Sequence, residues 1–230
     1  MVKYKLLTAL FVFLLMVGAC SFNTPSVTLV RKERIYSETQ QGSLSERLAV
    51  FILLEDTDGR NDYKELTLRE DATGLQWTIY RENTVFLQEA GHSNDVQWVG
   101  SNKFKYPRRM FPAGSYTVCA FDLGGNKTEM SFSLQEPQSF SALPFEFTLQ
   151  DEQWSLRIFD GSACSTVSFI MLTADLQPLT VYRMEITGTD QNGDIRSLHD
   201  RSADARYIQC FCENTDRSAG FLSAPVPLRQ

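Results

Sequence analysis

The sequence feature that most restricts the fold of this chain is a regular alternation of short apolar segments with turn signals. From residue 47 onward, groups of Gly, Asn, Asp and Pro recur roughly every eight to twelve residues. Leu75, Trp77 and Ile79 alternate with polar neighbours, which is the period of a strand with one buried face. This rhythm is typical of β-sandwiches and predicts an all-β fold with one or two sandwich domains.

Two segments near the start of the body are ambiguous. Residues 47–55 are its most apolar stretch and predict a buried strand, although the preceding Ser-Leu-Ser-Glu is also a helix-capping pattern. Residues 27–36 alternate only in part and contain Arg31-Lys32-Glu33-Arg34, so we expect an edge strand or a short helix. Further strands are predicted at residues 65–69, 75–80, 85–88, 96–99, 116–121, 127–134, 145–149, 154–159, 166–173, 179–187, 195–198, 207–213 and 220–226.

The first twenty residues have the pattern of a secretory signal. Lys3 and Lys5 precede an almost unbroken apolar run at residues 6–17, and small residues then precede Cys20. The run is shorter than the roughly 20 apolar residues that span a bilayer, which favours a cleaved signal over a transmembrane helix. Val17-Gly18-Ala19-Cys20 resembles the lipobox of bacterial lipoproteins. The resemblance implies cleavage after residue 19 and lipidation of Cys20, whereas the alternative is an ordinary signal cut elsewhere.

One predicted hairpin of the body has a sequence pattern that can be compared with those of known protein families. Residues 112–126 include Pro-Ala-Gly before a strand and Asp-Leu-Gly-Gly-Asn after it. This pattern resembles the last hairpin of bacterial immunoglobulin-like and fibronectin-type-III-like modules, which implies an immunoglobulin-like β-sandwich. Matching inward-facing positions places Cys210, Cys212 and Asn214 on Val118, Ala120 and Asp122 of a second such hairpin. In that match Arg217 replaces a turn glycine, Gly125.

These segments predict a consecutive domain order. Residues 1–19 are the signal peptide, and residues 20–46 hold the lipidated cysteine, a tether and the first strand. A first sandwich at 47–136 is followed by a linker at 137–144, which contains Pro137 and Pro144. A second sandwich follows at 145–230. One larger, continuous sandwich is the alternative.

Composition excludes some function classes and weakens others. The 230-residue chain has a net charge of −6, which does not favour nucleic acid as a partner. Its two histidines, His92 and His199, argue against zinc and against a Ser-His-Asp triad. No pair of carboxylates is singled out by spacing as a general acid and base. We therefore predict no catalytic residues.

One segment has the oxygen density of a calcium site. Asp56, Asp58 and Asp62 surround Gly59, and Ca²⁺ binds six to eight oxygen ligands. The spacing departs from an EF-hand, and a reduced version recurs at residues 190–194. Both segments are more simply explained as tight turns, in which Asp, Asn and Gly are favoured. We expect no cofactor, with calcium as the alternative.

The four cysteines after Cys20 are Cys119, Cys164, Cys210 and Cys212. An exported protein meets oxidising conditions, so disulfides are permitted. Cys210 and Cys212 lie two apart and would share one face of a strand, so they are poorly placed to bond to each other. Cys164 precedes an earlier strand and is the candidate partner of either one. Buried, unpaired thiols are the alternative.

Together these features predict a non-enzymatic envelope lipoprotein that binds a protein or a polysaccharide. The loop at residues 89–95 and the basic stretch at 103–109 are the candidate contact regions. Ser21 stands where some lipoproteins retained in the inner membrane carry aspartate, which favours the outer membrane, with the periplasmic and external faces both open. The alternatives are a structural subunit of an envelope assembly and a carboxylate-dependent hydrolase.

Overall fold

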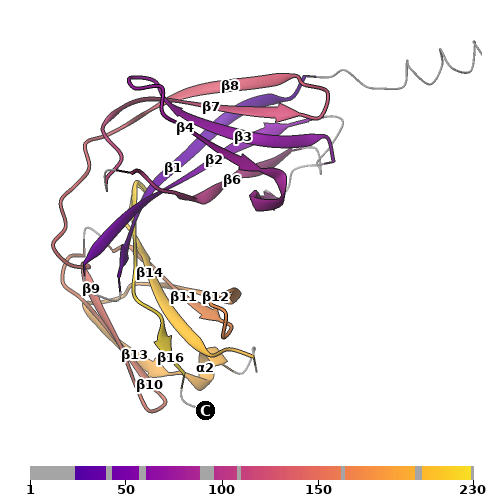
Figure 1. The fold of residues 1–230 in the computed structure, drawn as a ribbon. Helices are drawn as coiled ribbons and strands as arrows, with labels where there is room; N and C mark the ends of the chain where they lie inside the picture. The colour runs from indigo at the N-terminus through magenta and orange to yellow at the C-terminus, as the bar shows by residue number, and fades with distance from the viewer. Residues whose placement is uncertain are drawn as a thin grey trace, which may run out of the picture. The chain divides into compact units, whose positions relative to one another are not determined.

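The fold is almost entirely β. A computed structural model describes residues 24–39, 43–56, 61–88, 96–107, 110–161, 164–199 and 204–228 (Figure 1). These residues contain the short helical segments η1 (Arg81–Asn83) and α2 (Arg196–His199). The strands are β1 (Ser26–Glu38), β2 (Leu44–Glu55), β3 (Tyr63–Glu70), β4 (Gln76–Tyr80), β5 (Val85–Gln88), β6 (Val96–Phe104), β7 (Gly114–Asp122), β8 (Lys127–Leu134), β9 (Phe145–Gln150), β10 (Gln153–Ile158), β11 (Thr166–Leu172), β12 (Pro178–Glu185), β13 (Asp190–Asp194), β14 (Tyr207–Glu213), β15 (Ala219–Leu222) and β16 (Val226–Pro227). The predicted all-β, sandwich-type fold is confirmed.

Two compact units are assembled from segments that are separated in sequence. Unit 1 combines Met1–Val30, Phe51–Ser101 and Gly114–Ser133. Unit 2 combines Arg31–Val50, Asn102–Ala113 and Leu134–Gln230. Strands β1, β2 and β6 therefore contribute residues to both units. The domains predicted from sequence run consecutively instead, whereas residues 47–50, 102–113 and 134–136 of the predicted first sandwich belong to unit 2.

Unit 1 contains a sheet in the order β4-β3-β7-β8 and parts of β1, β2, β5 and β6. In β3, Leu66 and Leu68 are fully buried, and Leu68 pairs with Val118 of β7. Tyr63 of β3 meets Phe86 of β5 edge to face, with ring centroids 5.3 Å apart. Since β5 belongs to the other sheet, this contact joins two sheets across an apolar core, as in a sandwich.

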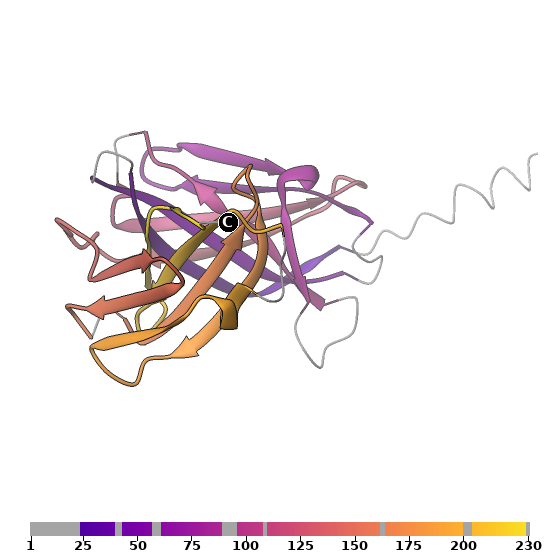
Figure 2. The same ribbon diagram turned by 90° about the horizontal axis from the view of Figure 1, so that it is seen from below.

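Strands of two sheets make up unit 2 (Figure 2). One contains β12-β11-β14-β15 followed by β1, and the other has the order β13-β10-β9. Between them, Phe169 of β11 packs against Trp154 of β10 at 4.8 Å and against Phe147 of β9 at 5.6 Å. Trp154 and Phe169 belong to the hydrophobic core of this unit, and Phe147 packs against that core.

Strand β1 differs from its prediction as an edge strand or short helix. It lies inside the sheet, between β15 and β2. It pairs in parallel with β15, from Arg34 opposite Ala219 to Ser37 opposite Leu222. The charged run in the sequence suggested a solvated edge, but partners on both sides fix this segment as an inner strand.

The segment around residues 190–198 also differs from its prediction. Residues 190–194, expected to form a turn, are strand β13, and residues 195–198, expected to form a strand, include most of the short helix α2. The physical reason is pairing with β10, which places Gly193 directly opposite Trp154. Because glycine has no side chain, Gly193 leaves room for the indole ring of Trp154. Glycine, which suggested a turn in the sequence, is therefore needed here for packing.

Replacing Gly193 with alanine should therefore destabilise unit 2. A Cβ atom at this position would lie 2.7 Å from ring carbons of Trp154, so the buried indole or the strand must move. We expect a loss of about 1–3 kcal/mol in the free energy of unfolding, as for other overpacked sites. Gly188→Ala is the matched control, because a Cβ at Gly188 meets no atom within 4 Å. Equal denaturation midpoints for the two variants would contradict the packing argument.

The two hairpins that the sequence matched share a turn geometry. Gly125 and Arg217 both have positive φ angles, 87° and 54°. The N–H of Gly125 donates to the carbonyl oxygen of Asp122 at 3.3 Å, and the N–H of Arg217 donates to that of Asn214 at 3.1 Å. The match of Arg217 to a turn glycine is therefore correct in backbone conformation.

Candidate functional site

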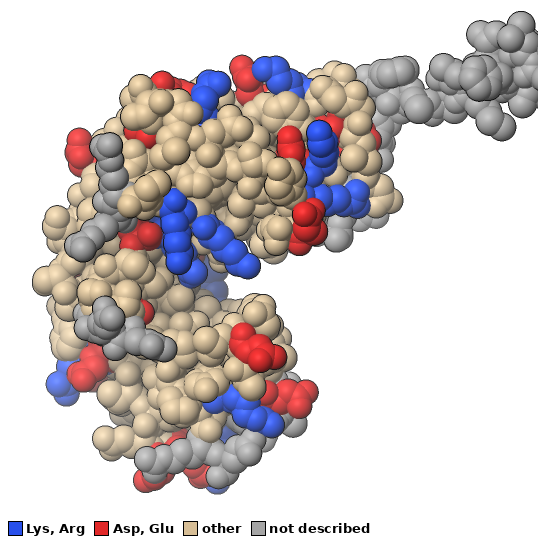
Figure 3. All heavy atoms as spheres, in the orientation of Figure 1, with Lys and Arg blue, Asp and Glu red and all other residues tan. Residues whose placement is uncertain are grey.

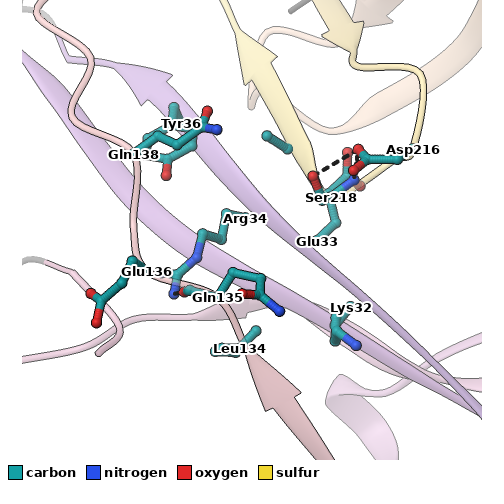
Figure 4. Close-up of a pocket in the computed structure, with 11 residues that line it drawn as sticks. Lys32, Glu33, Arg34, Tyr36, Leu134, Gln135, Glu136, Gln138, Asp216 and Ser218 are labelled. Carbon is teal, nitrogen blue, oxygen red and sulfur yellow. Dashed lines mark hydrogen bonds between the residues drawn. The ribbon is translucent and has the colours of Figure 1, made fainter. Parts of the chain in front are cut away.

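Unit 2 contains a hollow of about 230 Å³, which we call the β1 pocket (Figure 4). Its walls come from β1, from the chain that follows β8 and from the turn between β14 and β15. Its polar lining residues are Lys32, Glu33, Arg34, Tyr36, Gln135, Glu136, Gln138, Asp216 and Ser218. Every lining residue belongs to unit 2.

Arg34 fixes one wall of the β1 pocket. Its guanidinium donates to the carboxylate of Glu46 on β2, to the carbonyl oxygen of Phe111 at 2.9 Å and to that of Gln135 at 2.6 Å. Figure 4 shows its side chain directed toward Gln135. Arg34 and Glu46 are each only 6% exposed. Burial raises the pKa of Glu46 despite the opposing effect of Arg34. Arg34 therefore ties β1 to three other chain segments beside the hollow.

Tyr36 supplies the aromatic part of the wall. Its ring stacks on Phe221 at 5.4 Å and meets Phe140 edge to face at 4.9 Å. The hydroxyl is hydrogen-bonded to the backbone of Gln138, and burial raises the pKa of Tyr36. This packing holds the segment after β8 against β1.

Glu33 is the carboxylate with the most unusual environment in the pocket. Burial, with repulsion from Glu213, raises its pKa to about 7, against a smaller opposing effect of Arg217. One oxygen, Oε1, is buried without a hydrogen-bond partner among the described residues. A Cβ atom at Gly220 would lie 2.6 Å from this oxygen. Glu33 is therefore held close to the backbone of β15, beside the pocket.

The environment of Glu33 makes stability depend on pH. Its folded-state pKa of about 7 lies above the ordinary value of 4.5, so the folded protein retains a proton that the unfolded chain releases between these values. Stability from this group is complete below pH 4.5 and is lost as the pH rises through 7. From pH 5 to 8, the wild type should lose on the order of 2 kcal/mol relative to Glu33→Gln.

Denaturant unfolding at several pH values measures this difference. Glu38→Gln, which removes an exposed carboxylate from the same strand, controls for the change in net charge. If the free energies of unfolding of wild type and Glu33→Gln change with pH in the same way, the Glu33 carboxyl does not titrate between pH 5 and 8 in the folded protein.

Asp216 has the opposite environment. It accepts from the backbone N–H of Ser218 at 3.1 Å and from the Ser218 hydroxyl at 2.7 Å, as marked in Figure 4. These bonds lower the pKa of Asp216. The β1 pocket thus combines two carboxyl groups with opposite shifts: the pKa of Glu33 is raised and the pKa of Asp216 is lowered. Its size suits one side chain or one sugar ring more than a drug-sized ligand, which takes about 300 Å³ or more.

Several predicted site residues lie outside the described residues: Cys20, Asp58, the loop at 89–95 and residues 108–109. Asp56 is buried, Asp62 is partly buried, and both belong to unit 1. Within the described ranges, no group of three or more His, Cys, Asp or Glu side chains is arranged to hold a metal ion. Calcium binding at Asp56, Asp58 and Asp62 stays a prediction.

The basic stretch at residues 103–109 begins in a strand, because β6 continues to Phe104. Lys103 and Lys105 are exposed on either side of the buried Phe104. Tyr106 packs against Phe111 with ring centroids 5.4 Å apart. This stretch lies in unit 2, but it does not line the β1 pocket.

The surface also bears on the assembly alternative. Edge strand β12 carries Leu179 and Val181, which are 41% and 58% exposed, and an exposed edge can add a further strand. On the face drawn in Figure 3, uncharged side chains cover most of the surface and charges of both signs lie among them. No helix in the described ranges is both long enough and apolar enough to cross a bilayer.

Sequence reasoning missed Glu33, Arg34 and Glu46 as site residues. The sequence did contain an indication for Glu46. It lies two and four residues before Leu48 and Val50, so all three side chains face the same side of a strand. Leu48 and Val50 are fully buried, and Glu46 therefore also faces the interior. The partner, Arg34, lies in the charged run of β1, where nothing local distinguishes an inward-facing arginine.

Comparisons with known proteins give distant likenesses of fold. No family model matches the chain, and no curated protein sequence matches it. Among solved structures it is similar to the 47-kilodalton lipoprotein Tp47 of Treponema pallidum, with a TM-score of 0.43 and 10% identity over 88% of this chain and 50% of that one. It is also similar to dimeric latent PorU from Porphyromonas gingivalis, with a TM-score of 0.35 and 10% identity over 89% and 20%. A tetra-tandem repeat from a large adhesion protein gives a TM-score of 0.24 and 13% identity over 86% and 50%. The chain spans at most half of each of these proteins, and at such scores the likenesses say nothing about activity.

Proposed function

We propose that the chain is a bacterial envelope lipoprotein, held at the outer membrane by Cys20, whose immunoglobulin-like β-sandwich body binds another protein or a polysaccharide without catalysis. The observation that carries the proposal is the Val17-Gly18-Ala19-Cys20 pattern after a basic and apolar leader. Two or three acyl chains hold a protein at a membrane far better than one, since each buried CH₂ contributes roughly 0.8 kcal/mol.

The β1 pocket supports the binding part of the proposal. Arg34 and Tyr36 fix its walls through buried contacts, so the cavity is formed before any ligand arrives. Preorganised walls lower the entropy that binding costs. Gln135 and Gln138 offer amide donors and acceptors beside the aromatic ring, which suits a polar chain end or a sugar.

Filling the pocket tests this function. Gln138→Trp should block the hollow, whereas Ser139→Trp is the matched control, because Ser139 is also exposed but does not line it. Each full-length protein, in detergent, is mixed with purified peptidoglycan and with solubilised envelope from the same cells. Wild type and Ser139→Trp should retain a component that Gln138→Trp loses. Identical retention by all three proteins, or none by any, would contradict pocket-mediated binding.

A carboxylate-dependent hydrolase is the second candidate, favoured by one observation. The pocket lining contains Glu33, with a pKa of about 7, and Asp216, with a lowered pKa, and divided pKa values are the pattern of an acid paired with a base. Asp216 is already engaged by Ser218, which favours a structural role for it. Release of soluble sugar from peptidoglycan by the wild type, lost in both Glu33→Gln and Asp216→Asn, would establish the enzyme instead.

A further inference from the structure

Three of the cysteines converge in the core of unit 2. Cys164 is 2% exposed, and Cys210 and Cys212 are fully buried. The thiol of Cys212 lies within hydrogen-bonding reach of the thiols of both Cys164 and Cys210. All three are free thiols in the structure.

The register of β11 and β14 explains which thiols meet. Cys212 lies opposite Val167, near the start of β11, and Cys210 lies opposite Phe169, farther along it. Cys164 precedes β11, and the N–H of the next residue, Ser165, donates to the carbonyl oxygen of Glu213 at 2.7 Å. This bond holds the chain before β11 against the end of β14 that carries Cys212.

Other pairings fit the geometry less well. Cys210 and Cys212 lie on the same face of one strand, where Cβ atoms two residues apart are roughly 7 Å from each other. A disulfide requires Cβ atoms about 3.5–4.5 Å apart. Cys119 lies on β7 opposite Thr67, in unit 1. Cys164 and Cys212 are therefore the pair whose thiols meet from two different chain segments, at the end of β14 where Ser165 is bonded to Glu213.

We propose that Cys164 and Cys212 form a disulfide in the mature protein and that Cys210 remains a thiol. The inference rests on the proposed export of the chain to an oxidising compartment. The oxidant is a protein or small-molecule disulfide. The thiolate of one cysteine attacks the disulfide of the oxidant, forms a mixed disulfide and releases one sulfur of the oxidant as a thiolate. The second cysteine of the pair then attacks the mixed disulfide and releases the other sulfur of the oxidant. The Cys164–Cys212 bond forms as the S–S bond of the oxidant breaks, and the two thiol protons pass to the oxidant, which is reduced to two thiols.

The bond should form while the chain folds. Contact with Cys212 and burial raise the pKa of Cys164. The hydrogen bond with Cys164 lowers the pKa of Cys212, but contact with Cys210 and burial outweigh it, so that pKa is raised as well. The folded, reduced protein thus holds little thiolate, which is the reactive form. Oxidation of the folded protein should be at least roughly tenfold slower than oxidation during refolding.

The test uses the full chain in detergent. The protein is reduced, denatured and refolded with reduced and oxidised glutathione, then alkylated, digested and mapped by mass spectrometry. We expect one linked peptide joining Cys164 to Cys212, with Cys119 and Cys210 alkylated. Cys210→Ala should keep the link. The oxidised protein should melt roughly 10 °C above the reduced one, as for a disulfide that closes a long loop.

Alkylation of Cys164 in the refolded wild type, or a link from Cys164 to Cys210 or Cys119, would overturn the pair. Alkylation of cells at harvest separates this inference from the proposed function. A link that forms on refolding but is missing from harvested cells would support the pair and contradict export.

Discussion

The Glu46→Gln variant should unfold with a free energy about 3 kcal/mol lower than that of the wild type. Glu46 lies inside unit 2 and pairs with Arg34, which is almost fully buried as well. Removing the negative charge leaves the Arg34 cation, which is only 6% exposed, with a neutral side chain and two backbone carbonyl oxygens as partners. The cost arises from the unpaired buried charge and less from the loss of the bond itself.

The reciprocal change, Arg34→Met, should cost at least as much. It leaves the Glu46 carboxylate without its cation and the carbonyl oxygens of Phe111 and Gln135 without this donor. Denaturant unfolding of both single variants and of the double variant gives the coupling between them. Glu129→Gln is the control, since its pair with Lys127 is more than half exposed and should contribute less than about 1 kcal/mol. A Glu46→Gln midpoint equal to that of Glu129→Gln would show that the buried pair contributes nothing.

The Cys20→Ser variant should lose its membrane association almost completely. Without a thiol at position 20 no diacylglyceryl group can be attached, and a hydroxyl does not replace it in the lipobox-like pattern. Loss of two or three acyl chains removes tens of buried CH₂ groups, each contributing roughly 0.8 kcal/mol. Membrane pelleting of cell lysates, followed by detection of the protein, measures the membrane-bound fraction.

Ser21→Ala is the matched control for that experiment, because it changes the neighbouring residue and keeps the thiol. It should pellet with the membrane as the wild type does. Equal membrane-bound fractions for Cys20→Ser and wild type would mean that something other than lipid at Cys20 holds the protein.

Most strands could be predicted from sequence because their information is local. Alternating segments such as Leu66 and Leu68 in β3, bounded by Asp, Asn and Gly, contain both the strand period and the turns that end it. The correspondence between the turn residues Gly125 and Arg217 could also be predicted, because aligning the inward-facing residues of the two strands determines which turn residues correspond.

Pairing between distant segments could not be read in the same way. The Asp190–Asp194 segment has the composition of a turn and becomes strand β13 only because β10 pairs with it. Strand β1 looks like a solvated edge until β15 is placed beside it. The division into units has the same origin, because β1, β2 and β6 contribute to both units while the sequence suggests consecutive domains.

The β1 pocket was beyond sequence reasoning for a related reason. Its walls are formed by residues 32–36, 134–138 and 216–219. No local sequence pattern predicts that these three segments lie together. The raised pKa of Glu33 depends on burial and on Glu213, neither of which spacing reveals.

The mass of the mature protein tests the central claim most directly. The protein is purified in detergent from cells that make the full chain, and its intact mass and amino-terminal peptide are measured by mass spectrometry. We expect a chain that begins at Cys20 and carries a diacylglyceryl group on its sulfur, with or without a further acyl chain on its amino group. A chain that begins downstream of Cys20, or one that carries an unmodified thiol there, would contradict it.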